Sequence, residues 1–200
     1  MRPAWFPDWT GETAVVVASG PSAAEADLRG CPGRARVIAV NESWRLHRGA
    51  DVLYACDPGW WVYRHGVPEF EGLRITADAG AAEHFGISHV ALQEGQHRIL
   101  TEPGQIGDGG NSGFQAVNLA VQFGARRIVL VGFDYRGDHW HGRHGGNLAN
   151  PGANQLAVWS QRLDAEAARL RSLGLEVFNT SPTSALRAYP LRDLASALEP

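Results

Sequence analysis

The chain has 200 residues, of which 44% are hydrophobic and 20% are charged, and its formal net charge is −3. This size and composition predict one globular domain over residues 1–200, with a core large enough to need no disulfide bonds. The mixed, slightly acidic charge argues against a large basic surface, and therefore against duplex nucleic acid as a partner.

Cysteine usage and hydropathy set the expected compartment. The two cysteines, Cys31 and Cys56, have neither a metal-ligand spacing nor a C-x-x-C spacing, so a reduced, cytoplasmic setting is the expectation. The first residues lack the unbroken apolar run of a signal peptide. No segment reaches the roughly 20 apolar residues that a membrane span needs, so we expect none. Assembly into a homo-oligomer stays open.

Short apolar segments predict a series of β-strands. Most are continuous β-branched runs, which are typical of parallel strands buried on both faces. Two weaker candidates lie at residues 73–76 and 90–92. The clearly marked strands are residues 14–18, 37–40, 52–55, 128–131 and 175–178.

Two helices are marked by apolar residues that repeat at spacings of three and four. They span residues 114–123 and 154–173, and Gly124 and Gly174 follow them where C-terminal caps are expected. Strands that alternate with helices indicate βαβ units. The predicted fold class is therefore α/β, a single Rossmann-like domain with a mostly parallel sheet and helices on both faces.

Polar residues follow the predicted strands, at the edge where open α/β sheets bind ligands. Ser19-Gly20-Pro21-Ser22 follows the first strand, and Asn41 follows the second. Asp57 follows the third strand, and Asp134-Tyr135 comes after the strand at 128–131. Each of these ends carries a group able to bond a ribose, a base or a phosphate. For Asn41 the alternative is a plain turn residue.

Two serines have the spacing of a capping box. Ser22 with Glu25, and Ser112 with Gln115, each follow a glycine-rich turn and are predicted to open a helix. The free N–H groups of a helix N-terminus bind anions, so two such termini at one cleft suit a diphosphate or phosphodiester. Taken singly, each box is equally well an ordinary cap.

The common nucleotide signatures are missing. No G-x-G-x-x-G follows the first strand and no G-x-x-x-x-G-K-[ST] occurs, which argues against NAD dehydrogenases and P-loop kinases. Asp57-Pro58 predicts a helix start with Asp57 as its cap. The alternative for Asp57 is an acceptor for a ligand hydroxyl or a magnesium ligand. Trp60 and Trp61 are predicted to pack in the core rather than stack on a base.

Residues 133–153 lack periodicity and are predicted to form a lid or active-site loop. They contain the sequence His139-Trp140-His141-Gly142-Arg143-His144. A loop histidine is a natural general base near neutral pH, which favours substrate binding or catalysis. A solvated loop is the second interpretation. A metal site is the third, because no cysteine or ordered helix frames these histidines.

The ordered set of motifs resembles the single-domain bacterial sialyltransferases. The resemblance covers roughly residues 15–184, and it extends to the archaeal-type 6-hydroxymethyl-dihydropterin pyrophosphokinases. Short phage-encoded proteins also look similar, with runs like Tyr54-Ala55-Cys56-Asp57. The motifs that carry the resemblance are Gly20-Pro21-Ser22, the strand-end Asn41, Asn111-Ser112-Gly113-Phe114 and Gly132-Phe133-Asp134-Tyr135.

The sialyltransferase resemblance implies roles for individual residues. Tyr135 would sit near the departing phosphate, and His144, or next His139, would be the catalytic base. The family's second leaving-group tyrosine has no clear match. The resemblance implies that Gly20, Pro21, Ser22 and Asn41 contact the nucleotide and that Ser112 and Gly113 meet the phosphate or donor sugar. From their places after strands or before a helix, Asp57, Asn111 and Asp134 are also expected to bind the nucleotide.

Three functions follow as hypotheses. The preferred one is a nucleotide-sugar-dependent glycosyltransferase that moves a sugar to an acceptor hydroxyl and requires no metal or other cofactor. The second is a pyrophosphokinase-like phosphoryl transferase, with Mg²⁺ held by Asp57 and Asp134. The chain has no lysine, which counts against ATP chemistry. The third is a non-catalytic nucleotide-binding protein. The donor and the acceptor stay undefined at this stage.

Overall fold

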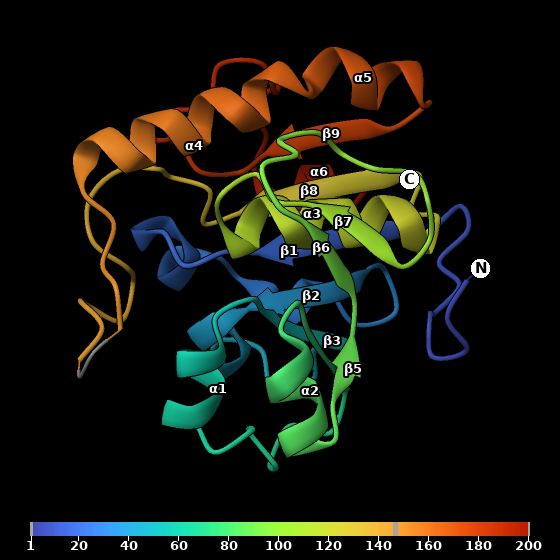
Figure 1. Ribbon diagram of the computed structural model, residues 1–200. Helices are drawn as coiled ribbons and strands as arrows, with labels where there is room; N and C mark the ends of the chain where they lie inside the picture. The colour runs from blue at the N-terminus through green and yellow to red at the C-terminus, as the bar shows by residue number, and fades with distance from the viewer. Residues whose placement is uncertain (1, 146–147, 200) are drawn as a thin grey trace.

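The computed structural model describes residues 2–145 and 148–199. Seven parallel strands form one sheet in the order β5-β4-β3-β2-β1-β8-β9 (Figure 1). This sheet, flanked by helices, confirms the predicted α/β Rossmann-like class. The strands are β1 Thr13–Val17, β2 Arg36–Val40, β3 Val52–Ala55, β4 Leu73–Thr76, β5 Ser88–His89, β8 Arg127–Val131 and β9 Glu176–Asn179.

The order in which strands are added to the sheet changes direction at β1. From β1 the chain moves outward through β2, β3 and β4, and it later returns to place β8 on the other side of β1. Val17 is in register with Ala39 of β2 and with Val131 of β8. Such a switch point opens a crevice at the carboxyl ends of the strands, where ligands of open α/β sheets bind.

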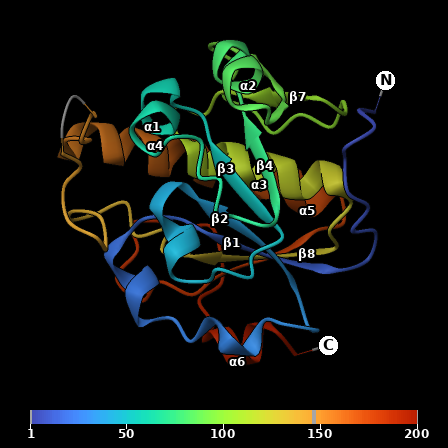
Figure 2. The same cartoon turned by 90° about the horizontal axis from the view of Figure 1, so that it is seen from below.

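Helices cover both faces of the sheet. Alternate residues of β1 face opposite ways, so Val16 packs in the cluster that contains Phe114 of α3. Val15 packs in the cluster that contains Ala197 of α6. Figure 2 shows α6 on the opposite side of the sheet from α3. The helices are α1 Pro58–Tyr63, α2 Ala79–Phe85, α3 Ser112–Phe123, α4 Ala153–Ala165, α5 Ala167–Ser172 and α6 Leu194–Ala197.

The helix predicted over residues 154–173 is divided in two at Glu166. The Glu166 N–H bonds to the Leu163 carbonyl, a tighter i−3 bond, and its buried carboxylate accepts a hydrogen bond of 2.8 Å from the Ile99 N–H. This long-range contact ties the helix to another segment and interrupts its regular path. Gly124 and Gly174 have the left-handed φ values of +94° and +81° that C-terminal caps need.

A second, two-stranded parallel sheet lies outside the main one. Its strands are β6 Ala91–Gln93 and β7 Gln105–Gly107. The weak candidate at 90–92 therefore belongs to this small sheet, and β7 has no signal of its own in the sequence pattern. Among the described residues, no helix is both long enough and apolar enough to cross a membrane.

Candidate active site

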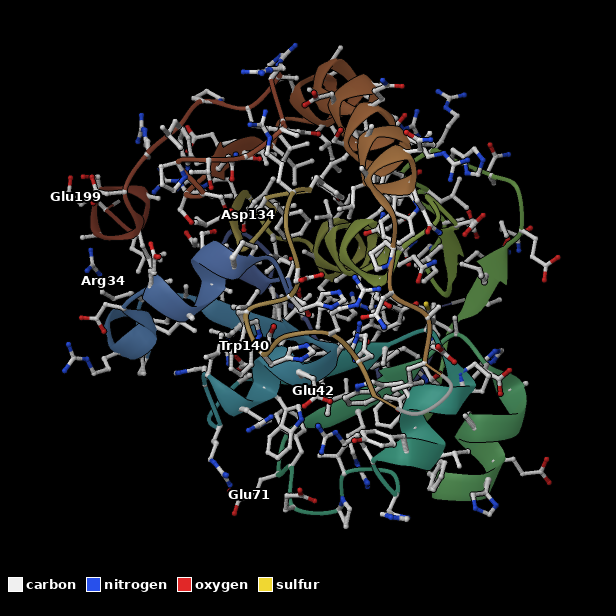
Figure 3. All side chains as sticks on the ribbon, turned by 90° about the vertical axis from the view of Figure 1, so that its left-hand side faces the viewer. Arg34, Glu42, Glu71, Asp134, Trp140 and Glu199 are labelled. Atoms are coloured by element: carbon white, nitrogen blue, oxygen red, sulfur yellow. The ribbon has the colours of Figure 1, made fainter. Side chains whose placement is uncertain are left out.

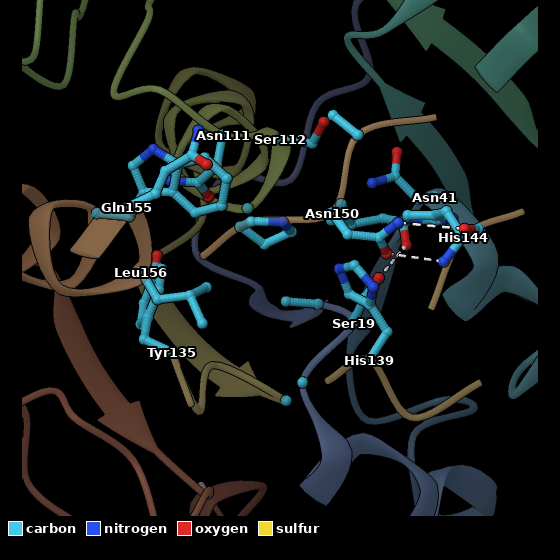
Figure 4. Close-up of a pocket in the computed structure, with 18 of the residues that line it drawn as sticks. Ser19, Asn41, Asn111, Ser112, Tyr135, His139, His144, Asn150, Gln155 and Leu156 are labelled. Carbon is cyan, nitrogen blue, oxygen red and sulfur yellow. Dashed lines mark hydrogen bonds between the residues drawn. The ribbon is translucent and has the colours of Figure 1, made fainter. Parts of the chain in front are cut away.

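A cavity of about 290 Å³ opens at the switch point of the sheet. The segments after β1, β2, β3 and β8 line it, together with the start of α3 and the loop that leads into α4. Figure 4 shows His139 and His144 on the side of this cavity opposite Asn111 and Tyr135. Of the residues expected to contact the nucleotide, its phosphate or the sugar, those that line the cavity are Gly20, Asn41, Asp57, Asn111, Ser112, Gly113, Tyr135, His139 and His144.

Gly20 is the part of its motif that faces the cavity, because Asp134 fills the space behind it. A Cβ at Gly20 would overlap the Asp134 carboxylate and the Gly132 carbonyl. The fully buried carboxylate accepts hydrogen bonds from the Ser22 hydroxyl at 2.7 Å and the Thr183 hydroxyl at 3.1 Å. Pro21, Ser22 and Asp134 do not line the cavity and instead form the support of the turn.

The first capping box is therefore wrong. The helix that follows β1 is a short 3-10 helix, η1 Pro21–Glu25, whose N-cap is Gly20 and has no side-chain cap. Ser22 lies inside this helix rather than at its cap position, and its hydroxyl donates to Asp134. A five-residue 3-10 helix also lacks the aligned dipoles of an α-helix, so the predicted pair of helical anion sites reduces to one.

That one site is the N-terminus of α3, where the cap is Asn111 rather than Ser112. The Asn111 Oδ1 accepts a hydrogen bond from the Phe114 N–H at 3.0 Å. The Ser112 hydroxyl instead accepts from the Cys56 N–H at 3.2 Å. Gln115 cannot close a capping box because its amide bonds to the Tyr54 hydroxyl and the Asp108 carbonyl, both at 2.8 Å. The remaining N–H groups of the first turn, those of Ser112 and Gly113, have no acceptor within the helix, and both residues line the cavity.

Three buried polar atoms around the cavity have no hydrogen-bond partner among the described residues. They are Asn41 Oδ1, Asn111 Nδ2 and the Tyr135 hydroxyl. An unmet buried polar group costs about 1–3 kcal/mol. Asn41 and Tyr135 also hold left-handed backbone conformations, with φ values of +50° and +51°. Strain of this kind gathers where a structure positions ligand groups.

Tyr135 is held in its protonated form. Burial raises the pKa of its hydroxyl, and the nearby Asn111 amide offsets part of that rise, although the two groups do not reach hydrogen-bond geometry. A protonated hydroxyl can donate a hydrogen bond to an anion in the cavity.

The loop that carries the histidines is tethered over the strand ends. The Trp140 N–H donates to the Ser19 carbonyl at 3.0 Å, and its indole N–H donates to the Ser43 hydroxyl at 3.2 Å. Figure 3 shows Trp140 near Glu42, which belongs to the same 3-10 helix as Ser43, η3 Asn41–Arg45. Trp140 therefore fixes the loop beside the switch point.

Asn150 holds the other end of the histidine segment. Its Oδ1 accepts from the His144 N–H at 2.8 Å, and its Nδ2 donates to the His144 carbonyl at 3.1 Å (Figure 4). These anchors, Ser43, Trp140 and Asn150, were not predicted, because their partners are main-chain and hydroxyl groups that no local pattern reveals. Residues 146 and 147, inside the predicted loop 133–153, lie outside the described residues.

Burial keeps the loop imidazoles neutral. It lowers the pKa of His139 and of His144, and it lowers the pKa of His141 to about 4. Near pH 7 each ring therefore has a free lone pair on one nitrogen. His139 and His144 present such rings to the cavity, and His141 does not line it.

A buried ion pair involves Glu42 of η3, next to the cavity-lining residue Asn41. Glu42 is 1% exposed and accepts hydrogen bonds from the Arg64 guanidinium, two of 2.6 Å, and from the Trp60 indole at 3.0 Å. Burial alone would raise the pKa of Glu42, but the hydrogen bonds and charge of Arg64, together with the Trp60 indole, hold the pKa below its ordinary value. Trp60 and Trp61 are buried in the core as predicted, and Trp60 also lines the cavity.

The two aspartates assigned to magnesium occupy different places. Asp57 lines the cavity and caps α1, accepting a hydrogen bond of 2.7 Å from the Gly59 N–H. Asp134 is buried behind the Gly20 turn. The two carboxylates therefore do not both line the cavity.

Comparison with known proteins gives structural matches alone. No protein-family model and no curated protein matches the sequence. The MAf glycosyltransferase from Magnetospirillum magneticum AMB-1 matches with a TM-score of 0.69 and 14% identity, covering 98% of this chain and 35% of that one. The chain therefore spans about a third of the length of that glycosyltransferase.

Sialyltransferase structures match over most of both chains. CST-II in complex with a trisaccharide acceptor and CMP has a TM-score of 0.57 and 13% identity, covering 91% of this chain and 86% of that one. CstII from Campylobacter jejuni, in complex with the substrate analogue cytidine-5'-monophosphate, has a TM-score of 0.57 and 12% identity, covering 96% and 88%. These likenesses confirm the predicted resemblance at the level of the fold. The pyrophosphokinase and phage resemblances stay predictions.

Proposed function

We propose that this chain is a glycosyltransferase that moves a sugar from a nucleotide-sugar donor to an acceptor hydroxyl. One observation carries the proposal: the unpaired Asn111 and Tyr135 side-chain atoms, at and near the N-terminus of α3, face neutral imidazoles across a single cavity. This arrangement pairs an anion site with a base. The glycosyltransferase-like fold supports it, and the related structures include one holding CMP and a saccharide acceptor.

The nucleotide part of the donor lies against the strand ends in this proposal. Gly20 lets the donor approach the main chain after β1, while Pro21, Ser22 and Asp134 support that turn from behind. Asn41 offers an unpaired acceptor oxygen, which suits a ribose hydroxyl or a base amino group. Asp57 offers a carboxylate at the same edge.

The chemical step is a displacement at the anomeric carbon. An imidazole nitrogen of His144, or of His139, takes the proton of the acceptor hydroxyl as its oxygen bonds to that carbon. The bond from the anomeric carbon to the phosphate oxygen breaks, and the electron pair stays on the phosphate. The N–H groups at Ser112 and Gly113 and the Asn111 amide stabilise that charge, and the Tyr135 hydroxyl donates to it. The products are the glycoside and the nucleotide.

The test begins with the donor. Thermal-shift measurements with CMP, UDP, GDP, ATP and nucleotide sugars are expected to show the largest stabilisation with one sugar nucleotide. Turnover is then measured with that donor and an acceptor panel. Removing metal with EDTA is expected to leave transfer intact, whereas the magnesium-dependent alternative predicts its loss.

Variants then test the base. His144→Ala or His139→Ala is expected to lower turnover by about 10²–10⁴-fold, the usual contribution of a general base, with donor affinity little changed. His89→Ala, an exposed histidine of β5, is the matched control. Unchanged turnover in both loop variants would exclude a histidine base. Tight donor binding without any product would indicate a non-catalytic nucleotide-binding protein.

A further inference from the structure

Three histidines of the loop between β8 and α4 converge on one point. The ligand nitrogens of His139, His141 and His144 all lie within 4.8 Å of one another, and the three side chains are partly buried. The ring centroids are 4.5 Å apart for His139 and His144 and 4.9 Å apart for His141 and His144. Within residues 2–145 and 148–199, no other three histidine, cysteine, aspartate or glutamate side chains meet in this way.

One nitrogen of the cluster, His141 Nε2, is shielded from water and has no hydrogen-bond partner among the described residues. The His139 and His141 rings are stacked, with centroids 5.2 Å apart and planes 6° apart, so they do not bond edge to edge. A buried polar atom of this kind calls for a ligand, and imidazole nitrogen is the commonest protein ligand of transition metals.

We propose that His139, His141 and His144 bind one transition-metal ion of the zinc class. Imidazole nitrogens suit Zn²⁺, and three protein ligands leave the fourth position to water from the cavity. Tetrahedral Zn–N bonds of about 2.1 Å place ligand nitrogens about 3.4 Å apart, so the rings must move closer together than their present spacing. Gly142, between the ligands, has φ +83° and no atom within 4 Å of its would-be Cβ, which leaves the loop room to adjust.

Two of the proposed metal ligands are also the residues proposed as the catalytic base. The effect of the metal on sugar transfer therefore rests on the proposed function. His139 and His144 line the cavity and are the residues assigned to take the acceptor proton. A nitrogen lone pair that holds a metal ion cannot accept a proton. Zinc is therefore a reversible inhibitor of transfer and not a cofactor, and the loop switches between a metal-bound inactive form and a metal-free active form.

The binding test uses the full chain after removal of metal with EDTA. Equilibrium dialysis against Zn²⁺ is expected to show one ion per chain, and Co²⁺ is expected to give the visible bands of a low-coordinate site. His141→Ala is expected to weaken Zn²⁺ binding more than about tenfold, since it removes a direct ligand. His89→Ala is the control with unchanged binding. Lack of saturable binding, or equal binding by His141→Ala, overturns the metal site.

The activity test separates the metal site from the proposed function. Zn²⁺ is expected to inhibit transfer, EDTA to restore it, and His141→Ala to transfer normally while resisting inhibition. Full metal occupancy without inhibition would leave the metal site standing and remove His139 and His144 as bases. If no donor supports transfer, the proposed function fails, and dialysis with the Co²⁺ spectrum still decides the metal site.

Discussion

Gly20 shows how a single residue type is fixed by its surroundings. A Cβ at this position would overlap the Asp134 carboxylate and the Gly132 carbonyl, and the Gly20 N–H donates to that carbonyl at 2.9 Å. The sequence predicted a turn at Gly20 after the first strand, and this residue lines the cavity, while its contact with a ligand stays a prediction. It could not show that Asp134 stands behind the turn, because the contact joins residues far apart in the chain and depends on the pairing of β1 with β8.

Gly20→Ala tests this close approach. The added methyl group must displace the Asp134 carboxylate, and overpacking of this kind costs about 1–3 kcal/mol. Urea unfolding is expected to show that loss together with weaker donor binding. Gly49→Ala is the control, because its Cβ would meet only the His47 ring at 3.9 Å. Equal unfolding free energies for the two variants would show that Asp134 moves aside without cost and would contradict the close approach.

Arg64→Met tests the buried ion pair. It removes both 2.6 Å hydrogen bonds to the buried Glu42 carboxylate and leaves only the Trp60 indole and the longer 3.4 Å contact of Arg45, so the loss of unfolding free energy near pH 7 is expected to reach at most about 3–5 kcal/mol. The matched control is Arg29→Met, whose exposed pair with Asp27 is expected to contribute nothing measurable. Chemical denaturation checks both, and similar small losses would contradict a structural role for the pair.

The same pair gives a pH dependence with a defined sign. The folded-state pKa of Glu42 lies below its ordinary value of 4.5. The stabilisation is therefore fully present above about pH 4.5 and is lost as the pH falls through the folded value. Denaturation at several acidic pH values is expected to show the gap between Arg64→Met and the unaltered chain narrowing toward low pH. A constant gap would argue against this titration.

At the scale of single elements, α3 was predicted over 114–123 and observed over Ser112–Phe123. Its apolar face and its C-terminal Gly124 are local signals, which explains the agreement. The predicted cap, Ser112, was wrong because Asn111 and Ser112 are both good capping residues. The choice between them depends on distant partners: Cys56, after β3, bonds to Ser112, and Tyr54 of β3 bonds to Gln115. The division of the second helix at Glu166 has the same origin in a distant partner.

Asn111→Asp separates capping from ligand binding. Aspartate keeps the cap oxygen and is a good cap, so stability is expected to change by less than about 1 kcal/mol. It removes the Nδ2 donor and places a negative charge beside the proposed phosphate. Donor affinity, measured by calorimetry, is therefore expected to fall more than tenfold. Ser112→Ala, which removes a hydroxyl that bonds to Cys56, is the comparison. Unaltered donor affinity in Asn111→Asp would show that the phosphate does not bind beside Asn111.

At the scale of the whole molecule, the cavity joins both halves of the sheet. The β1–β3 segments supply Gly20, Asn41 and Asp57, and the chain after β8 supplies Tyr135 and the histidine loop. The parallel sheet could be predicted because its strands are apolar and continuous. The convergence of the three histidines could not be predicted, because their loop has no periodicity. Its path is set by hydrogen bonds of Trp140 to Ser19 and Ser43 and by those of Asn150 within the loop.

Ligand binding is expected to stabilise both halves together. A nucleotide at 100 times its Kd adds about 2.7 kcal/mol to the unfolding free energy. Hydrogen exchange is expected to slow in β1, β2 and β8 alike, since a ligand at the switch point contacts the ends of all three. Protection confined to the loop between β8 and α4 would show that the ligand binds outside the switch point.

The support behind Gly20 has a consequence for how the domain is assembled. Ser22 meets Asp134 across 112 positions of the chain, and Asp134 meets Thr183 across a further 49. Contacts of such separation form slowly, because the intervening chain must first be ordered. The Gly20 turn is thus translated before β8 and β9 but is supported from behind only after β8 and the segment beyond β9 have docked, so we expect the cavity to be completed among the last steps of folding.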